Sequence, residues 1–271
     1  SSTTTHPGAL LREWRLRRRM SQLDVSARTG VSTRHLSCVE TGRARASRDL
    51  LLFLSEEFEM PRRAANEMLL AAGFAPVYTE FELDDAAMSA ARDVIDLIVN
   101  GNDPHPTTVI DQRWNLVDAN AAALWLARDI SPDLMTPPIN IARMSLHPDG
   151  LAPRVLNFDE YAGQLLRHMQ HVLTLTYDPV LAELLDECED YAPGAARRVA
   201  VGPDVVLPIQ IVDEGVELTF VSTVTTFGAS RNVTLSELSI ETLYPADETT
   251  RHALAARPWA PSPGAASSPG P

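Results

Sequence analysis

Apolar positions recur every three or four residues through the first 75 residues, a spacing that predicts short amphipathic helices. Serines at helix starts and glycines at helix ends mark the boundaries of several of them. The pattern predicts a helix over about 9–19, a second from the cap Ser21 to Arg28, a third from Ser32 to just before Gly42, a fourth capped by Ser47 and a fifth from Pro61 to near Gly73. We expect an all-α head of five helices.

The pattern changes after residue 76. Residues 76–83 read as an extended linker, and a helix capped by Asp84 follows, with Met88, Ala91, Ile95 and Ile98 on one stripe. Segments rich in β-forming residues then alternate with segments of helical spacing. The expected elements are a hairpin of 107–111 and 114–118, helices over 121–127, 159–174 and 178–189, and strands over 205–212, 216–227 and 233–244. This order predicts an α+β domain with an antiparallel sheet.

The chain therefore divides into two domains and connecting segments. The expected divisions are a disordered lead over 1–7, the helical head over 8–75, a linker and helix over 76–104, the α+β domain over 105–247 and a disordered tail over 248–271. The end of the tail is rich in Pro, Ser, Ala and Gly, which cannot form a packed core.

Charge is distributed unevenly along a chain whose net charge is −13. Residues 1–75 carry 12 Arg and 8 Asp or Glu, whereas the remainder is strongly acidic. A basic head on an acidic body is typical of a protein that contacts nucleic acid through one region only. The 2 Cys, far apart, form neither a metal motif nor a disulfide framework, which favours the cytoplasm. No apolar run is long enough for a membrane span and no signal peptide is evident, so no membrane partner is expected.

Residues 22–41 meet the steric requirements of a helix-turn-helix. The first helix must present an apolar residue followed by a small one, and the turn must tolerate a positive φ. The second helix needs apolar anchors on one face and a polar face that can enter a major groove about 12 Å wide. The residues that meet these requirements are Val25-Ser26, Gly30, Val31, Leu36 and Val39.

Residues 8–73 resemble the Cro and phage-repressor family of helix-turn-helix regulators, the XRE class. The matching positions are Gln22, Val25, Gly30, Val31-Ser32, Leu36, Val39 and Glu40-Thr41-Gly42-Arg43. Ser26 and Thr29 depart from the family, which commonly has Ala and an apolar residue there. The resemblance implies a transcriptional regulator that binds double-stranded DNA as a homodimer, on a pseudo-palindromic operator.

The resemblance also implies roles for single residues. Thr33 and Arg34 should meet base edges, with Ser37 and Cys38 as further candidates one turn on. An arginine such as Arg34 can donate two hydrogen bonds to guanine. Gln22 and Arg43 should hold phosphates, and Arg15 and Glu40 should form an ion pair that ties the first helix to the third.

Some of these positions have a plain alternative. Arg45 and Arg48 are either phosphate contacts or surface charge. Arg17-Arg18-Arg19 is better explained as a solvated face than as a base contact. The Arg15–Glu40 pair could instead be exposed and contribute little to stability.

The second domain carries a resemblance of its own. The predicted hairpin followed by Asp118-Ala119-Asn120-Ala121-Ala122-Ala123 resembles the strand-strand-helix start of PAS-type domains. The order of the whole chain resembles the MmyB-like regulators, in which such a domain follows an XRE head. Asn-Ile-Ala-Arg at 140–143 and Leu-His-Pro at 146–148 agree with this loosely, and the match covers about 105–245. The resemblance implies a small apolar ligand of fatty-acid type and no other cofactor.

Apolar and polar residues of this domain are candidates for a ligand pocket. The candidates are Trp114, Trp125, Leu126, Arg143, Met144, His147, Leu166, Met169, Leu218 and Phe220. For each apolar one, ordinary core is the favoured alternative. Arg143 and His147 either fix a carboxylate or form a surface pair. His168 and His171 have no third ligand at useful spacing, so no metal is expected.

Three hypotheses follow for function. The first is a ligand-responsive DNA-binding regulator, in which helix 84–99 or the sheet domain forms the dimer contact. The second is a DNA-binding regulator whose second domain is a protein-interaction or dimerisation module without a small molecule. The third is an enzyme with a DNA-binding appendage, but no nucleophile elbow, phosphate loop or zinc signature supports it, so no enzyme is expected.

Overall fold

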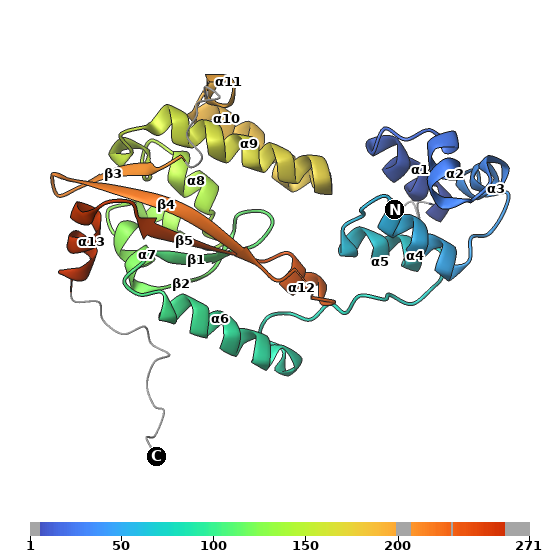
Figure 1. Ribbon diagram of the computed structural model, residues 1–271, viewed down its shortest axis with the longest axis horizontal. Helices are drawn as coiled ribbons and strands as arrows, with labels where there is room; N and C mark the ends of the chain where they lie inside the picture. The colour runs from blue at the N-terminus through green and yellow to red at the C-terminus, as the bar shows by residue number, and fades with distance from the viewer. Residues whose placement is uncertain (1–5, 199–206, 229, 258–271) are drawn as a thin grey trace, which may run out of the picture. The chain divides into compact units, whose positions relative to one another are not determined.

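Helices alone build the first part of the chain, and a sheet with helices builds the second (Figure 1). The computed structural model describes residues 6–198, 207–228 and 230–257. One compact unit runs through Glu80 and includes Arg231–Val233, and the other begins at Phe81. In the described part of the chain, no helix is long and apolar enough to cross a membrane.

The first unit contains the five predicted helices. They are α1 (Pro7–Arg17), α2 (Gln22–Thr29), α3 (Thr33–Glu40), α4 (Arg48–Glu57) and α5 (Arg62–Ala71). Ser21, Ser32 and Ser47 each accept a hydrogen bond from the backbone N–H three residues further on, as N-cap residues do. The predicted disordered lead is wrong at its end, because Pro7 opens α1 and His6 caps that helix. Residues 1–5 of that lead lie outside the described residues.

The core of the first unit is formed by the inward faces of these helices. Its fully buried side chains include Leu11, Val25, Leu36, Leu51 and Phe58. Gly8 allows α1 to pack directly on the end of α3, since a Cβ at Gly8 would meet the carbonyl oxygen of Val39 at 2.0 Å. Helix α1 therefore packs closely against α3 of the helix-turn-helix, and this close contact requires glycine at position 8.

The second unit is built on a five-stranded sheet. The strands are β1 (Thr107–Ile110), β2 (Leu116–Ala119), β3 (Ile209–Asp213), β4 (Val216–Thr226) and β5 (Ser239–Pro245). Their order is β2-β1-β5-β4-β3, and every neighbouring pair is antiparallel. Glu214 and Gly215 both have positive φ in the β3–β4 turn, as a tight hairpin requires. The predicted α+β domain with an antiparallel sheet is confirmed.

Helices cover both faces of this sheet (Figure 1). The α-helices of the unit are α6 (Ser89–Gly101), α7 (Ala121–Leu126), α8 (Ile141–Leu146), α9 (Phe158–Thr176), α10 (Pro179–Tyr191), α11 (Ala195–Arg198), α12 (Val233–Ser236) and α13 (Glu248–Ala255). Short 3-10 turns lie at Ala86–Met88, Pro132–Met135 and Ala152–Arg154. One face packs on α6, where Ile95 and Val99 meet Val109 and Ile240. The opposite face packs on α8 and α9, behind which lies α10.

Three predictions for this unit need correction. The tail predicted as disordered from residue 248 begins with α13, whose cap is Asp247 and whose Leu254 is buried against the sheet. Residues 233–244 are not one strand, because α12 precedes β5. The helix expected from Asp84 begins at Ser89, after a 3-10 turn. Residues 258–271 of the tail and 205–206 of a predicted strand lie outside the described residues.

Candidate functional site

Helix α3 has one buried face and one polar face. Leu36 and Val39 are buried on the inward side, together with Glu40. On the other side Arg34 is exposed, while Thr33, Ser37 and Cys38 are half-buried. His35, which the sequence did not single out, is exposed beside Arg34. The predicted polar face is therefore present, with Arg34 and His35 as its exposed members in this helix.

The turn before α3 is set by backbone conformation. Gly30 ends α2 with φ at 75°, and a Cβ built on it would meet nothing within 4 Å. Glycine is thus required by the left-handed backbone and not by space. The hydroxyl of Thr29 donates to the Val25 carbonyl and accepts from the Val31 N–H. The single hydroxyl of this side chain is thus satisfied both as donor and as acceptor, which explains why the turn accepts Thr in place of an apolar residue.

The candidate phosphate-binding arginines follow α3 along the chain. Arg43, Arg45 and Arg48 are exposed, between the end of α3 and the start of α4.

Arg18 was expected to lie on a solvated face, but its guanidinium donates to the carbonyls of Phe58 and Glu59. It satisfies carbonyls that the end of α4 leaves without helical partners.

Arg15 and Glu40 form the predicted ion pair, and it is buried. Arg15 Nε donates to Glu40 Oε1 at 2.6 Å and Nη2 donates to Oε2 at 2.9 Å. The exposed fractions of the two side chains are 7% and 1%, so the alternative of an exposed pair is wrong. Arg15 Nη1 also donates to the Met20 carbonyl. This bidentate ion pair joins α1 to the end of α3.

Gln22 is a third member of this network. Its side-chain Nε2 donates to Glu40 Oε2 at 2.8 Å. An amide nitrogen carries two N–H groups, so one remains for a phosphate at the start of α2. The residue predicted to hold a phosphate thus also helps to satisfy the buried carboxylate.

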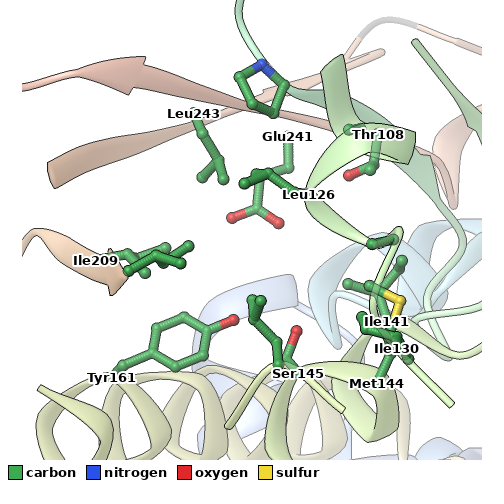
Figure 2. A pocket seen from close by; sticks show the side chains of 15 residues that line it. Thr108, Leu126, Ile130, Ile141, Met144, Ser145, Tyr161, Ile209, Glu241 and Leu243 are labelled. Carbon is green, nitrogen blue, oxygen red and sulfur yellow. The ribbon is translucent and has the colours of Figure 1, made fainter. Parts of the chain in front are cut away.

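The second unit contains an apolar cavity of about 80 Å³ (Figure 2). It lies between the sheet, through β1, β3 and β5, and the helices α7, α8 and α9. Eleven of its fifteen lining residues are apolar. The apolar side chains include Leu126, Ile130, Ile141, Met144, Ile209 and Leu243.

Four polar side chains complete the lining: Thr108, Ser145, Tyr161 and Glu241. Glu241 points from the sheet toward the hydroxyls of Tyr161 and Ser145, which point up from the helices (Figure 2). The Ser222 hydroxyl donates to Glu241 Oε1, and Tyr161 and Ser145 share a hydrogen bond. Burial raises the pKa of Glu241 and of Tyr161, because the interior disfavours their charged forms.

Of the ten predicted pocket residues, only Leu126 and Met144 line this cavity. Five others belong to the ordinary core: Trp114, Leu166 and Met169 pack between α8, α9 and α10, and Leu218 and Phe220 pack on the β3–β4 side. Trp125 packs against the core cluster that contains Leu218 and Phe220, with the guanidinium groups of Arg128 and Arg257 over its ring. These apolar side chains pack in the core, which is the alternative that the sequence favoured for each of them.

The two residues expected to fix a carboxylate are engaged elsewhere. Arg143 donates to both oxygens of Glu187, at 2.5 and 2.7 Å, and Tyr191 donates to the same carboxylate. The His147 ring packs edge-on against Tyr191, 4.9 Å between ring centroids. Neither residue lines the cavity, so the prediction that they hold a ligand's carboxylate there is wrong.

Sequence reasoning missed the four polar lining residues. One signal existed for Glu241, because alternation along β5 places it on the face opposite the buried Ile240. A carboxylate on a strand whose two faces are both covered by helices is unusual. Among the residues that the structure describes, no three His, Cys, Asp or Glu side chains gather as a metal site.

Two family models match the chain. A model described as "MmyB-like transcription regulator ligand binding domain" matches residues 91–256, more than half of the chain and all elements around the cavity. A model described as "Helix-turn-helix domain" matches residues 8–61, which include α2 to α4 and all of α1 but its first residue. No curated protein is significantly similar to the chain. The matches confirm the predicted order of a helix-turn-helix head followed by a ligand-binding domain of this class.

Proposed function

The chain belongs to the family of MmyB-like transcription regulators, and we propose that it binds DNA as a homodimer whose affinity is changed by a small apolar ligand in the cavity. That it is a DNA-binding transcription regulator follows from the two matched domains. The observation that supports the ligand is the cavity itself, an apolar space with four polar groups inside the matched ligand-binding domain. Such a lining is typical of small-molecule sites.

The size of the cavity bears on how a ligand enters. Its volume of about 80 Å³ is smaller than the ~300 Å³ lower end of ordinary ligand pockets. A ligand of fatty-acid size therefore requires the lining side chains to move apart. Met144 on α8 is suited to this, because its unbranched side chain adapts to different shapes. A ligand that binds only the opened form shifts the domain toward that form.

DNA contact is proposed for the polar face of α3 and the arginines that follow it. Arg34 is the proposed base-reading residue, and Arg43 with Gln22 the proposed phosphate-holding residues. In a dimer of this class the recognition helices lie about 34 Å apart, which requires an operator with two inverted half-sites. Sedimentation of the full chain tests the dimer directly.

The DNA experiment compares Arg34→Ala with Arg43→Ala on sequences selected from random DNA by the full chain. We expect Arg34→Ala to cost about 1–3 kcal/mol on the selected site and to relax the preference at one base pair. Arg43→Ala should weaken all sequences alike. Arg12→Ala, which removes an exposed arginine of α1, is the matched control. An Arg34→Ala protein with unchanged affinity and preference contradicts the assignment.

The ligand experiment is native mass spectrometry of the purified full chain, followed by DNA-binding measurements before and after removal of any bound species. We expect an apolar species in the protein and a changed DNA affinity once it is removed. A protein that carries no such species and responds to none favours the second candidate, a protein-interaction module. The small volume of the cavity is the observation that keeps this candidate open.

A further inference from the structure

Among the described residues that line the cavity, one side chain is acidic and none is basic. Of its four polar lining residues, only Glu241 is a carboxylate, and the others carry hydroxyl groups. Glu241 extends from β5 with its carboxylate directed into the space between the sheet and the helices (Figure 2). The polar end of any ligand in this cavity has to be compatible with that group.

The partners of Glu241 leave part of its hydrogen-bonding capacity unused. Within the described residues, Ser222 is its one hydrogen-bond partner, and no Arg or His comes within ion-pair distance. Asp213, at the end of β3, provides a contrast within the same unit, since Arg128, Arg154 and Arg257 all contact its carboxylate. A carboxylate oxygen can accept more than one hydrogen bond, so Glu241 can accept further hydrogen bonds from the cavity side.

The groups that face Glu241 across the cavity are uncharged. Tyr161 of α9 and Ser145 of α8 direct their hydroxyls toward it (Figure 2). Burial raises the pKa of Tyr161, and the Glu241 carboxylate raises it further. Burial raises the pKa of Glu241 itself, which shifts this group toward its uncharged, protonated form.

Building on the proposed function, in which the cavity holds an apolar ligand, we infer that the ligand's polar end is an uncharged hydroxyl group that hydrogen-bonds Glu241. The ligand is thus an apolar alcohol. A hydroxyl both donates and accepts, which matches a carboxyl group and the hydroxyls of Tyr161 and Ser145. The fatty-acid-like character expected from the family resemblance then describes its apolar body.

Charged headgroups fit this site less well. A free fatty acid would bring a second carboxyl group beside Glu241 with no cation to compensate, so at most one of the two can be ionised, and that charge would lose its hydration in an apolar space. An amine would form an ion pair, but both ions would lose their hydration in an apolar space. The alcohol avoids both costs.

The test is a headgroup series at constant chain length: octanol, octanoate and octylamine, each titrated into the full chain by calorimetry at neutral pH. We expect octanol to bind about tenfold or more tightly than octanoate, the ratio that one unit of unfavourable pKa shift represents. Tightest binding of octanoate or octylamine overturns the inference, and so does equal binding of all three. Equal binding of all three still supports the proposed ligand-binding function. If none of the three binds, the inference is also overturned, and the native mass-spectrometry experiment then tests the proposed function by itself.

A substitution of Glu241 tests whether this residue causes the preference for octanol over octanoate. Glu241→Gln keeps the shape of the side chain and replaces the acid with a hydrogen-bonding amide. We therefore expect the affinity for octanoate to rise about tenfold relative to the affinity for octanol. Glu217→Gln makes the same change at an exposed position of β4 and should leave the ratio unchanged. An unchanged ratio in Glu241→Gln contradicts the role of Glu241. The series on the unaltered protein remains decisive if this variant folds poorly.

Discussion

Glu40 in the first unit and Glu241 in the second are carboxylates withdrawn from solvent whose surroundings differ completely. Glu40 receives hydrogen bonds from Arg15 and Gln22 and joins two helices. Glu241 receives a hydrogen bond from Ser222, and the rest of its carboxyl group faces an apolar cavity. A carboxylate with a full set of partners in the protein stabilises the arrangement of its helices, whereas one that lines a cavity and has few partners is a candidate to bind a ligand.

The same contrast separates the two functional surfaces. The residues proposed to contact DNA include the exposed Arg34 and Arg43, which need no protein partner in the absence of DNA because water solvates them. The polar residues that line the cavity are buried or half-buried, so they depend more on partners in the protein or in a ligand. Three substitutions test this difference, and they follow in order of expected effect.

The largest effect is expected from Glu40→Ala. It leaves Arg15 buried without its counter-ion, a change that typically costs about 3–5 kcal/mol. Urea denaturation followed by circular dichroism should show the loss in the transition of the first unit. Glu13→Ala removes the partner of Arg17 in a largely exposed pair and should cost less than about 1 kcal/mol. Similar losses in both variants would show that burial of the Arg15–Glu40 pair does not matter.

Gln22→Ala should show an intermediate effect in two assays at once. It removes a hydrogen bond to a buried carboxylate, worth about 2 kcal/mol in unfolding free energy, and a proposed phosphate contact. Denaturation and DNA binding are measured on the same preparation. Arg43→Ala is the control, because it should weaken DNA binding without changing stability. A Gln22→Ala protein of unaltered stability would mean that Arg15 alone satisfies Glu40.

The smallest effect is expected from Glu241→Gln in the absence of ligand, and it depends on pH. Burial raises the folded-state pKa of Glu241, so its stabilising contribution is complete below the unfolded pKa of about 4.3. It is lost as the pH rises through the folded-state pKa. Tyr161, the other titratable lining group, stays uncharged because burial raises its pKa as well.

Unfolding free energies of the wild type and Glu241→Gln are compared from about pH 4 to pH 8. The advantage of the wild type over the variant should shrink with rising pH. Glu217→Gln, the exposed control, should show no such trend. A difference that stays constant with pH would place Glu241 in contact with water or with a cation.

The first unit could be predicted almost completely from the sequence. Serine caps, the glycine at positive φ and the spacing of apolar residues act within one or two helical turns, so their effects can be read locally. The Arg15–Glu40 pair was also predicted, from the family resemblance. Its burial was not, because burial depends on how α1 packs against α3.

The cavity could not be predicted in the same way. Its lining joins Thr108 of β1, Ser145 of α8 and Glu241 of β5, which are far apart in the chain. Leu166 and Met169 are as apolar as Leu126 and Met144, yet the first two fill the core and the last two border the empty space. Composition cannot separate these outcomes, since both kinds of position need apolar side chains.

The sequence by itself determined the five-helix head, its helix-turn-helix, the antiparallel sheet and the order of the two domains. These depend on local propensity, on the period of the apolar pattern and on turn residues such as Gly30. Only the tertiary structure decided that Glu40 is surrounded by donors, that Arg143 pairs with Glu187, and that Glu241 faces a cavity. The surroundings of a side chain are set by elements distant in the chain, and only their packing shows whether a polar group is satisfied within the protein.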